Sequence, residues 1–151
     1  MTITTMVETA TAPTEGRRRD AQQRAHPHCF VCGDPQAGGL GLAFRVLPDG
    51  GVAADWHCPS KSQGFDGILH GGLIATLVDS AMVHALFARG VVARTAELRV
   101  RYRHPVRAGH PVSVVARLCW QTGPLSCLKA EVCQEGAVRA NAQGKFMAGP
   151  V

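Results

Sequence analysis

The sequence predicts an α+β domain in which one buried helix packs against an antiparallel sheet. Three observations support this fold class. Residues 71–89 carry apolar side chains at helical spacing on almost every side, which is typical of a helix wrapped by a larger neighbour. Short segments in which apolar and polar residues alternate precede and follow that helix. The chain has 151 residues, which is enough for one domain with its own core.

We expect two strands before the helix and four after it. The first two cover 42–47 and 52–57, and the residues between them, 48–51, read Pro-Asp-Gly-Gly, which is typical of a hairpin turn. A loop over 58–70 leads into the helix, and Gly90 ends it. The last four strands cover 95–102, 111–120, 125–134 and 137–147. Their short connections favour an antiparallel meander.

The N-terminal residues 1–25 are rich in Thr, Ala, Arg and Gln and have no large apolar residue after Val7. Such a segment buries too little apolar surface to offset the entropy of folding, so we expect a disordered tail over 1–25 and the folded domain over 26–151. The N-terminus lacks a basic region followed by an apolar run, and the most apolar segment, 73–88, is short and interrupted by polar residues. We therefore expect a cytoplasmic protein with no signal peptide and no membrane partner.

Two glycines, Gly71 and Gly72, open the predicted helix. The first backbone N–H groups of a helix lack intrahelical partners, and the helix dipole is positive there. Because glycine has no Cβ, a ligand carbonyl can approach the N–H of Gly71, which would stabilise negative charge on that oxygen. The alternative interpretation is that the two glycines only permit a tight turn.

Asp79 lies in the middle of the apolar helix, with no basic residue one turn away. A buried charge costs several kcal/mol unless it is paired or used, so Asp79 is a candidate functional residue. The alternative is a buried Asp that caps a loop amide. Gly71 and Asp79 are eight residues apart, or about 12 Å along a helix axis. If both act on one atom, Asp79 must come from a second copy of the chain, which predicts a homodimer with two shared sites.

The chain resembles the hotdog-fold acyl-CoA thioesterases of the PaaI/4-hydroxybenzoyl-CoA thioesterase superfamily. Three segments carry the resemblance: CFVCGDPQAGGLGL, HGGLIATLVDSAM and TAELRVRYRHPVRAG. It covers about residues 28–147. It implies a curved antiparallel sheet around one long helix, a homodimer or dimer of dimers, and hydrolysis of an acyl-CoA to the free acid and CoA. The alternative function is a non-catalytic acyl-CoA-binding protein with the same fold, acting as a sensor or pathway accessory.

The resemblance also implies roles for individual residues. The Gly71 amide would polarise the thioester carbonyl, His70 would shape the loop, and Asp79 would be the nucleophile or the general base. Thr95 falls where relatives carry a Thr or Ser that positions the water or the carboxylate. Gln63 is the nearest match to an Asn or Gln that precedes the His-Gly-Gly in many relatives, although its offset differs. Gly72 joins this set as a substrate-binding residue.

The positive charge of the chain is local. The net charge is +5, and residues 89–117 hold seven Arg against one acid, Glu97. Nucleic-acid binders usually spread basic residues over a whole face, so we expect an anionic small ligand and no nucleic acid. The phosphates of CoA suit this segment because Arg binds phosphate in a bidentate manner, whereas an ordinary solvated strand face is the alternative. The candidates are Arg99, Arg101, Arg103 and Arg107.

Cys29 and Cys32, separated by two residues, have the spacing of zinc ligands. Other potential ligands are His26, His28, His57 and Cys58. A strong zinc signature has a second pair with the same spacing, which this sequence lacks. We therefore expect no metal at the active site and no cofactor, with zinc binding by the Cys29–Cys32 segment as an alternative. A zinc-stabilised nucleic-acid-binding module would then be a third function.

Overall fold

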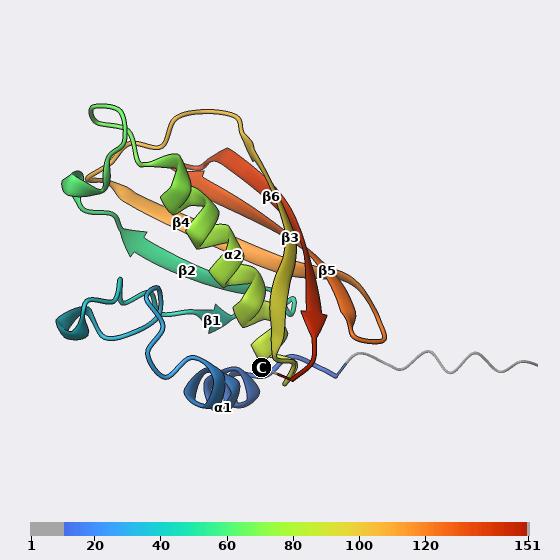
Figure 1. Cartoon of the computed structure of the whole chain (residues 1–151). Helices are drawn as coiled ribbons and strands as arrows, with labels where there is room; N and C mark the ends of the chain where they lie inside the picture. Colours follow the sequence, from blue (N-terminus) through green and yellow to red (C-terminus); the bar gives the residue numbers. More distant parts are fainter. Residues whose placement is uncertain (1–10, 151) are drawn as a thin grey trace, which may run out of the picture.

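The computed structural model describes residues 11–150. A six-stranded antiparallel sheet curves around one long helix (Figure 1), which confirms the predicted α+β class. The helices are α1 (Glu15–Ala25) and α2 (Gly71–Phe87), with short 3-10 helices at Pro35–Ala37 and Ser60–Ser62. The strands are β1 (Arg45–Val46), β2 (Val52–His57), β3 (Ala93–Tyr102), β4 (Pro111–Thr122), β5 (Leu125–Gln134) and β6 (Ala137–Ala148).

Helix α2 is the centre of the hydrophobic core. All of its residues from Ser80 to Phe87 are buried, and strands β2 to β6 contact it. Gly144 of β6 lets the helix approach the sheet closely, because a Cβ at this position would lie 2.8 Å from the sulfur of Met82. Within residues 11–150, no helix has both the length and the apolar composition needed to cross a bilayer.

The strands follow the order β1-β2-β4-β5-β6-β3, and every neighbouring pair is antiparallel. The predicted meander is confirmed for β4, β5 and β6 but is wrong for β3, which pairs with β6 and not with β4. Helix α2 carries the chain across the concave face of the sheet, and β3 then starts at the far edge (Figure 1). Periodicity within a segment does not encode which edge it joins. This strand order makes β1 and β3 the two edge strands of the sheet.

Strand β1 is shorter than the predicted segment 42–47. Leu42 and Phe44 are buried, as the alternating pattern predicts. However, the Leu42 N–H donates to the carbonyl of Val31 (3.0 Å), and the Leu40 N–H donates to that of Phe30 (2.7 Å). The residues before Arg45 therefore pair with the cysteine-containing loop instead of extending the sheet.

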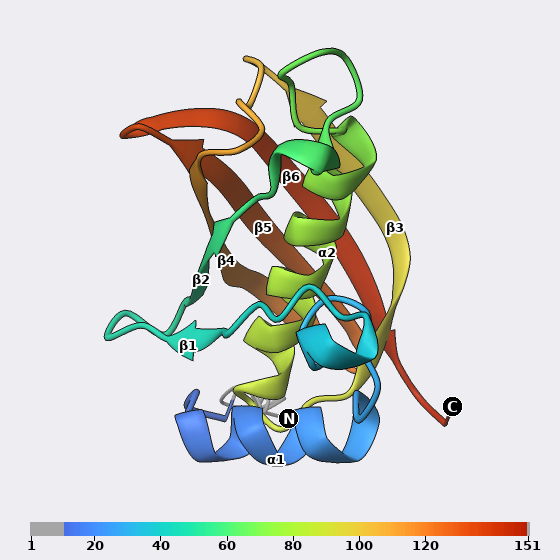
Figure 2. The same cartoon turned by 90° about the vertical axis from the view of Figure 1, so that its left-hand side faces the viewer.

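The predicted disordered tail over 1–25 is wrong for α1, and residues 1–10 lie outside the described part of the chain. The Thr14 side chain accepts from the Arg17 N–H at the helix start, and Ala21 is fully buried. Figure 2 shows α1 lying across the C-terminal end of α2. The composition argument fails because α1 docks through a small residue and through polar contacts, not through large apolar side chains. The folded domain therefore begins before His26.

The polar contacts of α1 centre on Arg18, which is only 5% exposed. It forms an ion pair with Glu15, and its Nη1 lies 3.2 Å from Nδ1 of His84 on α2. Burial lowers the pKa of His84 to about 3, and the positive charge of Arg18 acts in the same direction. A guanidinium can only donate, so the neutral His84 ring accepts this hydrogen bond.

Candidate active site

The start of α2 presents one backbone N–H group for a ligand. His70 is the N-cap, and its Nδ1 accepts from the Gly72 N–H (2.9 Å). Among residues 11–150, no protein group accepts from the Gly71 N–H, which is the first of the helix. A donor at this end also benefits from the positive end of the helix dipole. The Gly71 N–H is therefore open at the start of the helix, whereas the Gly72 N–H is already used by the cap.

Tyr102 packs beside Gly71 at ordinary contact distance. Its hydroxyl donates to the carbonyl of Gly71 (2.8 Å), and a Cβ at Gly71 would lie 3.4 Å from the Tyr102 ring. A Cβ at Gly72 would lie 3.0 Å from Nδ1 of His70, within the capping hydrogen bond. The two interpretations of the Gly-Gly pair are therefore compatible: the glycines fit a close packing arrangement, and they also leave one amide open. Sequence reasoning did not identify Tyr102 as a neighbour of Gly71.

Asp79 and Thr95 form a close pair across α2 and β3. The Thr95 hydroxyl donates to Oδ1 of Asp79 at 2.5 Å, and Asp79 is half-buried, not fully enclosed. A β-bulge between Thr95 and Glu97 shifts the strand register, so that Thr95 and the core-packed Leu98 both face α2. The sequence predicted both members of this pair, and the structure brings them together in one chain.

Gly71 and Asp79 occupy one uninterrupted helix. Their separation along the axis is thus about 12 Å, as the sequence predicts. One reacting carbonyl is too small to touch both groups in the same chain.

Gln63 lies in the loop before α2, where it is exposed. Its Oε1 accepts from the Gly67 N–H (2.9 Å), and its backbone forms an isolated bridge with Leu69. Gln63 therefore closes the loop that delivers the chain to His70. The structure places it as a support of the loop.

An apolar pocket of about 330 Å³ opens beside Gly71. Its wall includes Phe65, Ile68, Ile74, Tyr102 and Val106. Phe65 is 83% exposed and Tyr102 is 53% exposed, which is unusual for large aromatic groups on a small domain. Sequence reasoning missed this pocket because it joins the loop before α2 to the residues after β3. The signal in the sequence was an aromatic residue, Phe65, followed by Ile68 and Leu69 in a Gly-rich loop.

The four candidate arginines are not equivalent. Arg99 and Arg101 alternate along β3 with side chains that pack on the core, so they project from the outer face of the edge strand. Arg103 donates from Nε to the side chain of Asn141 (3.0 Å), and Arg107 forms an ion pair with Glu135. In the described part of the chain, neither Arg99 nor Arg101 forms an ion pair with a carboxylate.

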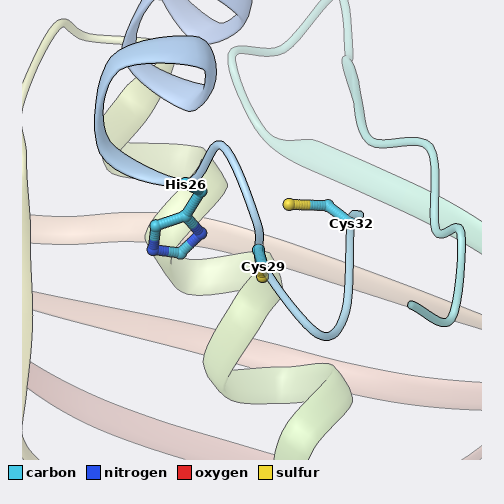
Figure 3. A group of neighbouring side chains, drawn as sticks. All are labelled: His26, Cys29 and Cys32. Carbon is cyan, nitrogen blue, oxygen red and sulfur yellow. The ribbon is translucent and has the colours of Figure 1, made fainter. Parts of the chain in front are cut away.

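The cysteine segment lies away from Gly71, between α1 and β1. His26, Cys29 and Cys32 each place a potential ligand atom within 4.8 Å of the others (Figure 3). Cys58 is not part of this group, because its thiol is buried and contacts the carbonyl of His110 (3.0 Å). The structure therefore selects three of the six potential ligands that the sequence offered.

Comparisons with known proteins point to one family. A family model described as the thioesterase superfamily matches residues 66–140. Acyl-coenzyme A thioesterase 13 of Mus musculus is 31% identical over 81 residues, which make up 52% of this chain and 58% of that protein. The chain therefore matches less than two thirds of the length of this curated relative.

Solved structures share the fold. A mutant of the phenylacetic acid degradation protein PaaI from Thermus thermophilus is 27% identical with a TM-score of 0.68, covering 77% of this chain and 100% of that one. The PaaI protein of E. coli is 18% identical with a TM-score of 0.75, covering 89% of this chain and 95% of that one. The order of the strands, the central helix and these matches agree with the resemblance in the sequence. The chain belongs to the thioesterase superfamily and has its hotdog fold.

Proposed function

We propose that this protein is an acyl-CoA thioesterase that hydrolyses R–CO–S–CoA to a carboxylic acid and CoA. The observation that carries the proposal is the hydrogen bond between Thr95 and Asp79 (2.5 Å), which fixes a half-buried carboxylate beside an edge strand. A carboxylate held in this way can remove a proton from water or attack a carbonyl. The name of the mouse relative, an acyl-coenzyme A thioesterase, supports the substrate class.

In the proposed reaction, the Gly71 N–H binds the thioester oxygen. Asp79 either takes a proton from the attacking water or attacks the carbonyl carbon itself. In both routes a tetrahedral oxyanion forms at the Gly71 N–H and collapses with cleavage of the C–S bond. The CoA sulfur leaves as a thiolate and takes up a proton. In the second route water then hydrolyses the Asp79 anhydride, so both routes consume one water.

A homodimer is part of the proposal. Gly71 and Asp79 are about 12 Å apart along α2, so the Gly71 of one chain must meet the Asp79 and Thr95 of another. β3 supports this arrangement, because it is an edge strand and carries Thr95. An edge strand has backbone groups that a second copy can pair with.

Two further features suit the two ends of the substrate. The apolar pocket beside Gly71 is placed to take the acyl chain or the apolar part of the CoA arm. Arg99 and Arg101 are the arginines best placed for CoA phosphates, because Arg103 and Arg107 already have side-chain partners.

The test is a thiol-release assay on the purified protein with short, medium, long and aryl acyl-CoAs. Asp79→Asn keeps the shape of the side chain, and we expect it to lower kcat by at least about 100-fold. Asp55→Asn is the matched control, since Asp55 is an exposed carboxylate on β2 that pairs with Arg45. Turnover that survives Asp79→Asn would contradict the proposal. Binding of acyl-CoA without turnover by the wild type would favour the non-catalytic binder.

A further inference from the structure

The loop that carries Cys29 and Cys32 is held in one conformation by its own backbone. The Gly33 N–H donates to the Cys29 carbonyl (2.8 Å), and a Cβ at Gly33 would lie only 2.2 Å from that oxygen. The loop is also paired with the next segment through the Phe30 and Val31 carbonyls, which accept from Leu40 and Leu42. These backbone hydrogen bonds fix the loop and thereby hold the Cα atoms of Cys29 and Cys32 in place.

The two thiols differ in their surroundings: a backbone N–H faces Sγ of Cys29, whereas burial raises the pKa of the Cys32 thiol to about 12. The Val31 N–H donates to Sγ of Cys29 (3.3 Å), and such a donor stabilises negative charge on sulfur. His26 supplies the third potential ligand from the C-cap of α1. Its Nδ1 is buried and has no hydrogen-bond partner in the described structure. Figure 3 shows one ring nitrogen of His26 turned to the side on which the two cysteines lie.

A buried ring nitrogen without a partner costs free energy unless a ligand satisfies it. Two thiols and an imidazole within 4.8 Å of one another are a suitable donor set for a soft divalent metal. We propose that His26, Cys29 and Cys32 form a zinc site, separate from Gly71, Asp79 and Thr95. A disulfide between the two cysteines would leave the His26 nitrogen unexplained, whereas a metal ion would use all three groups.

An opening of about 270 Å³ lies beside the cluster, and its wall includes Gln22, His26, Cys32 and Asp34. A water molecule can enter from this side, giving a site with three protein ligands and one exchangeable ligand. Binding converts the two thiols to thiolates and releases their protons to the solvent. The ion would join the end of α1 to the loop before β1. Because His26 also packs against Phe87, this junction would fasten α1 to α2.

The test uses the untagged full chain, reduced and stripped with a chelator, and then titrated with Zn²⁺ and with Co²⁺. We expect one metal ion per chain and, with Co²⁺, the sulfur-to-metal charge-transfer absorption and intense d–d bands of a tetrahedral thiolate site. Loss of a residue that only hydrogen-bonds a metal ligand typically weakens metal binding by roughly 10- to 100-fold. His26→Gln, Cys29→Ser and Cys32→Ser each remove a ligand itself and should weaken Zn²⁺ binding by more than that.

Two matched controls come from the same chain. His28→Gln removes an exposed histidine two residues from His26, and Cys119→Ser removes an exposed cysteine on β4. Both should bind Zn²⁺ like the wild type. The wild-type Co²⁺ spectrum alone decides the matter if a ligand variant fails to fold. No sulfur-to-metal band in the wild type, a Cys29–Cys32 disulfide that persists under mild reduction, or equal weakening in the controls would each overturn the proposal.

Discussion

The Thr95 hydroxyl lies 2.5 Å from Oδ1 of Asp79, across the interface between an edge strand and the central helix. The contact depends on the β-bulge after Thr95. Because of this bulge, the side chains of Thr95 and Leu98, three positions apart, both face α2. Without the bulge, strict alternation would place these two side chains on opposite faces. The sheet therefore uses a local irregularity to aim a polar group at the carboxylate.

Thr95→Val should lower kcat because it removes a hydrogen bond to a charged group. Such a bond contributes about 1.5 to 3 kcal/mol, which corresponds to a loss of roughly 10- to 100-fold in rate. Thr95→Ser keeps the hydroxyl and should retain most of the activity. Steady-state kcat and KM for the best acyl-CoA are the measurement. Equal kcat values for the Val and Ser variants would show that the hydroxyl is not used.

Gly71→Pro should remove the proposed oxyanion donor while keeping the helix. Gly71 is the first residue of α2, where proline is well tolerated, and His70 has φ −55° and ψ 129°, which suit a residue before proline. We expect kcat to fall by about 100- to 1000-fold, as for loss of an oxyanion donor. Gly71→Ala is the control, because it adds a Cβ near Tyr102 but keeps the N–H. If Ala impairs turnover as much as Pro, crowding explains the effect and the donor role is lost.

Mixing the inactive Gly71→Pro and Asp79→Asn chains should restore activity if each site is shared between two chains. In a mixed dimer, one site combines an intact Gly71 with an intact Asp79, and the other combines both defects. Co-refolding an equal mixture with differently tagged chains and isolating the mixed dimer should give about half of the wild-type turnover per dimer. No recovery in a confirmed mixed dimer would place both groups in one chain or exclude one of them from catalysis.

His70→Ala should destabilise the start of α2, because Nδ1 of His70 accepts from the Gly72 N–H (2.9 Å). Loss of an N-cap side chain costs about 1 kcal/mol of the free energy of unfolding. His70→Asn supplies another capping oxygen and should restore most of this stability. Urea unfolding followed by circular dichroism measures both. Identical unfolding midpoints for Ala and Asn would mean that the imidazole stabilises the fold in some other way.

Glu15 should make the docking of α1 dependent on pH. Partial burial acts to raise the pKa of Glu15, but hydrogen bonds from Arg18 and from the Val46 N–H outweigh it and hold the pKa below its ordinary value of 4.5. The unfolded chain therefore binds this proton more readily, so the stabilisation is present above pH 4.5 and is lost as the pH falls through the folded pKa.

Glu15→Gln removes this carboxylate, and it should lower stability at about pH 7 and flatten the pH dependence of stability below about pH 5. Asp20→Asn is the control, since Asp20 is an exposed carboxylate on the same helix that pairs with Arg24. Urea midpoints measured from neutral pH down to about pH 3 test this, and parallel curves for wild type and Glu15→Gln would contradict it.

Local pattern was enough to predict the central helix, the hairpin before it and the three consecutive strands that end the chain. The reason is that apolar periodicity and turn residues act over a few neighbouring positions. The same local logic made Gly71 a candidate, because the first N–H groups of every helix lack intrahelical partners. It made Asp79 a candidate, because a carboxylate in an apolar helix costs free energy unless it is paired or used. It also placed these two groups about 12 Å apart, since the rise of a helix is fixed.

The remaining features emerged only in the folded molecule, because each of them joins segments that are distant in the chain. The placement of β3 beside β6 depends on which edge of the sheet still has unpaired backbone groups after α2 has crossed it. The sequence did not predict helix α1, because Arg18 and Ala21 dock it on α2 and its own apolar content is low. The grouping of His26 with Cys29 and Cys32, rather than with Cys58, likewise follows from where the loop pairs with residues 40–42.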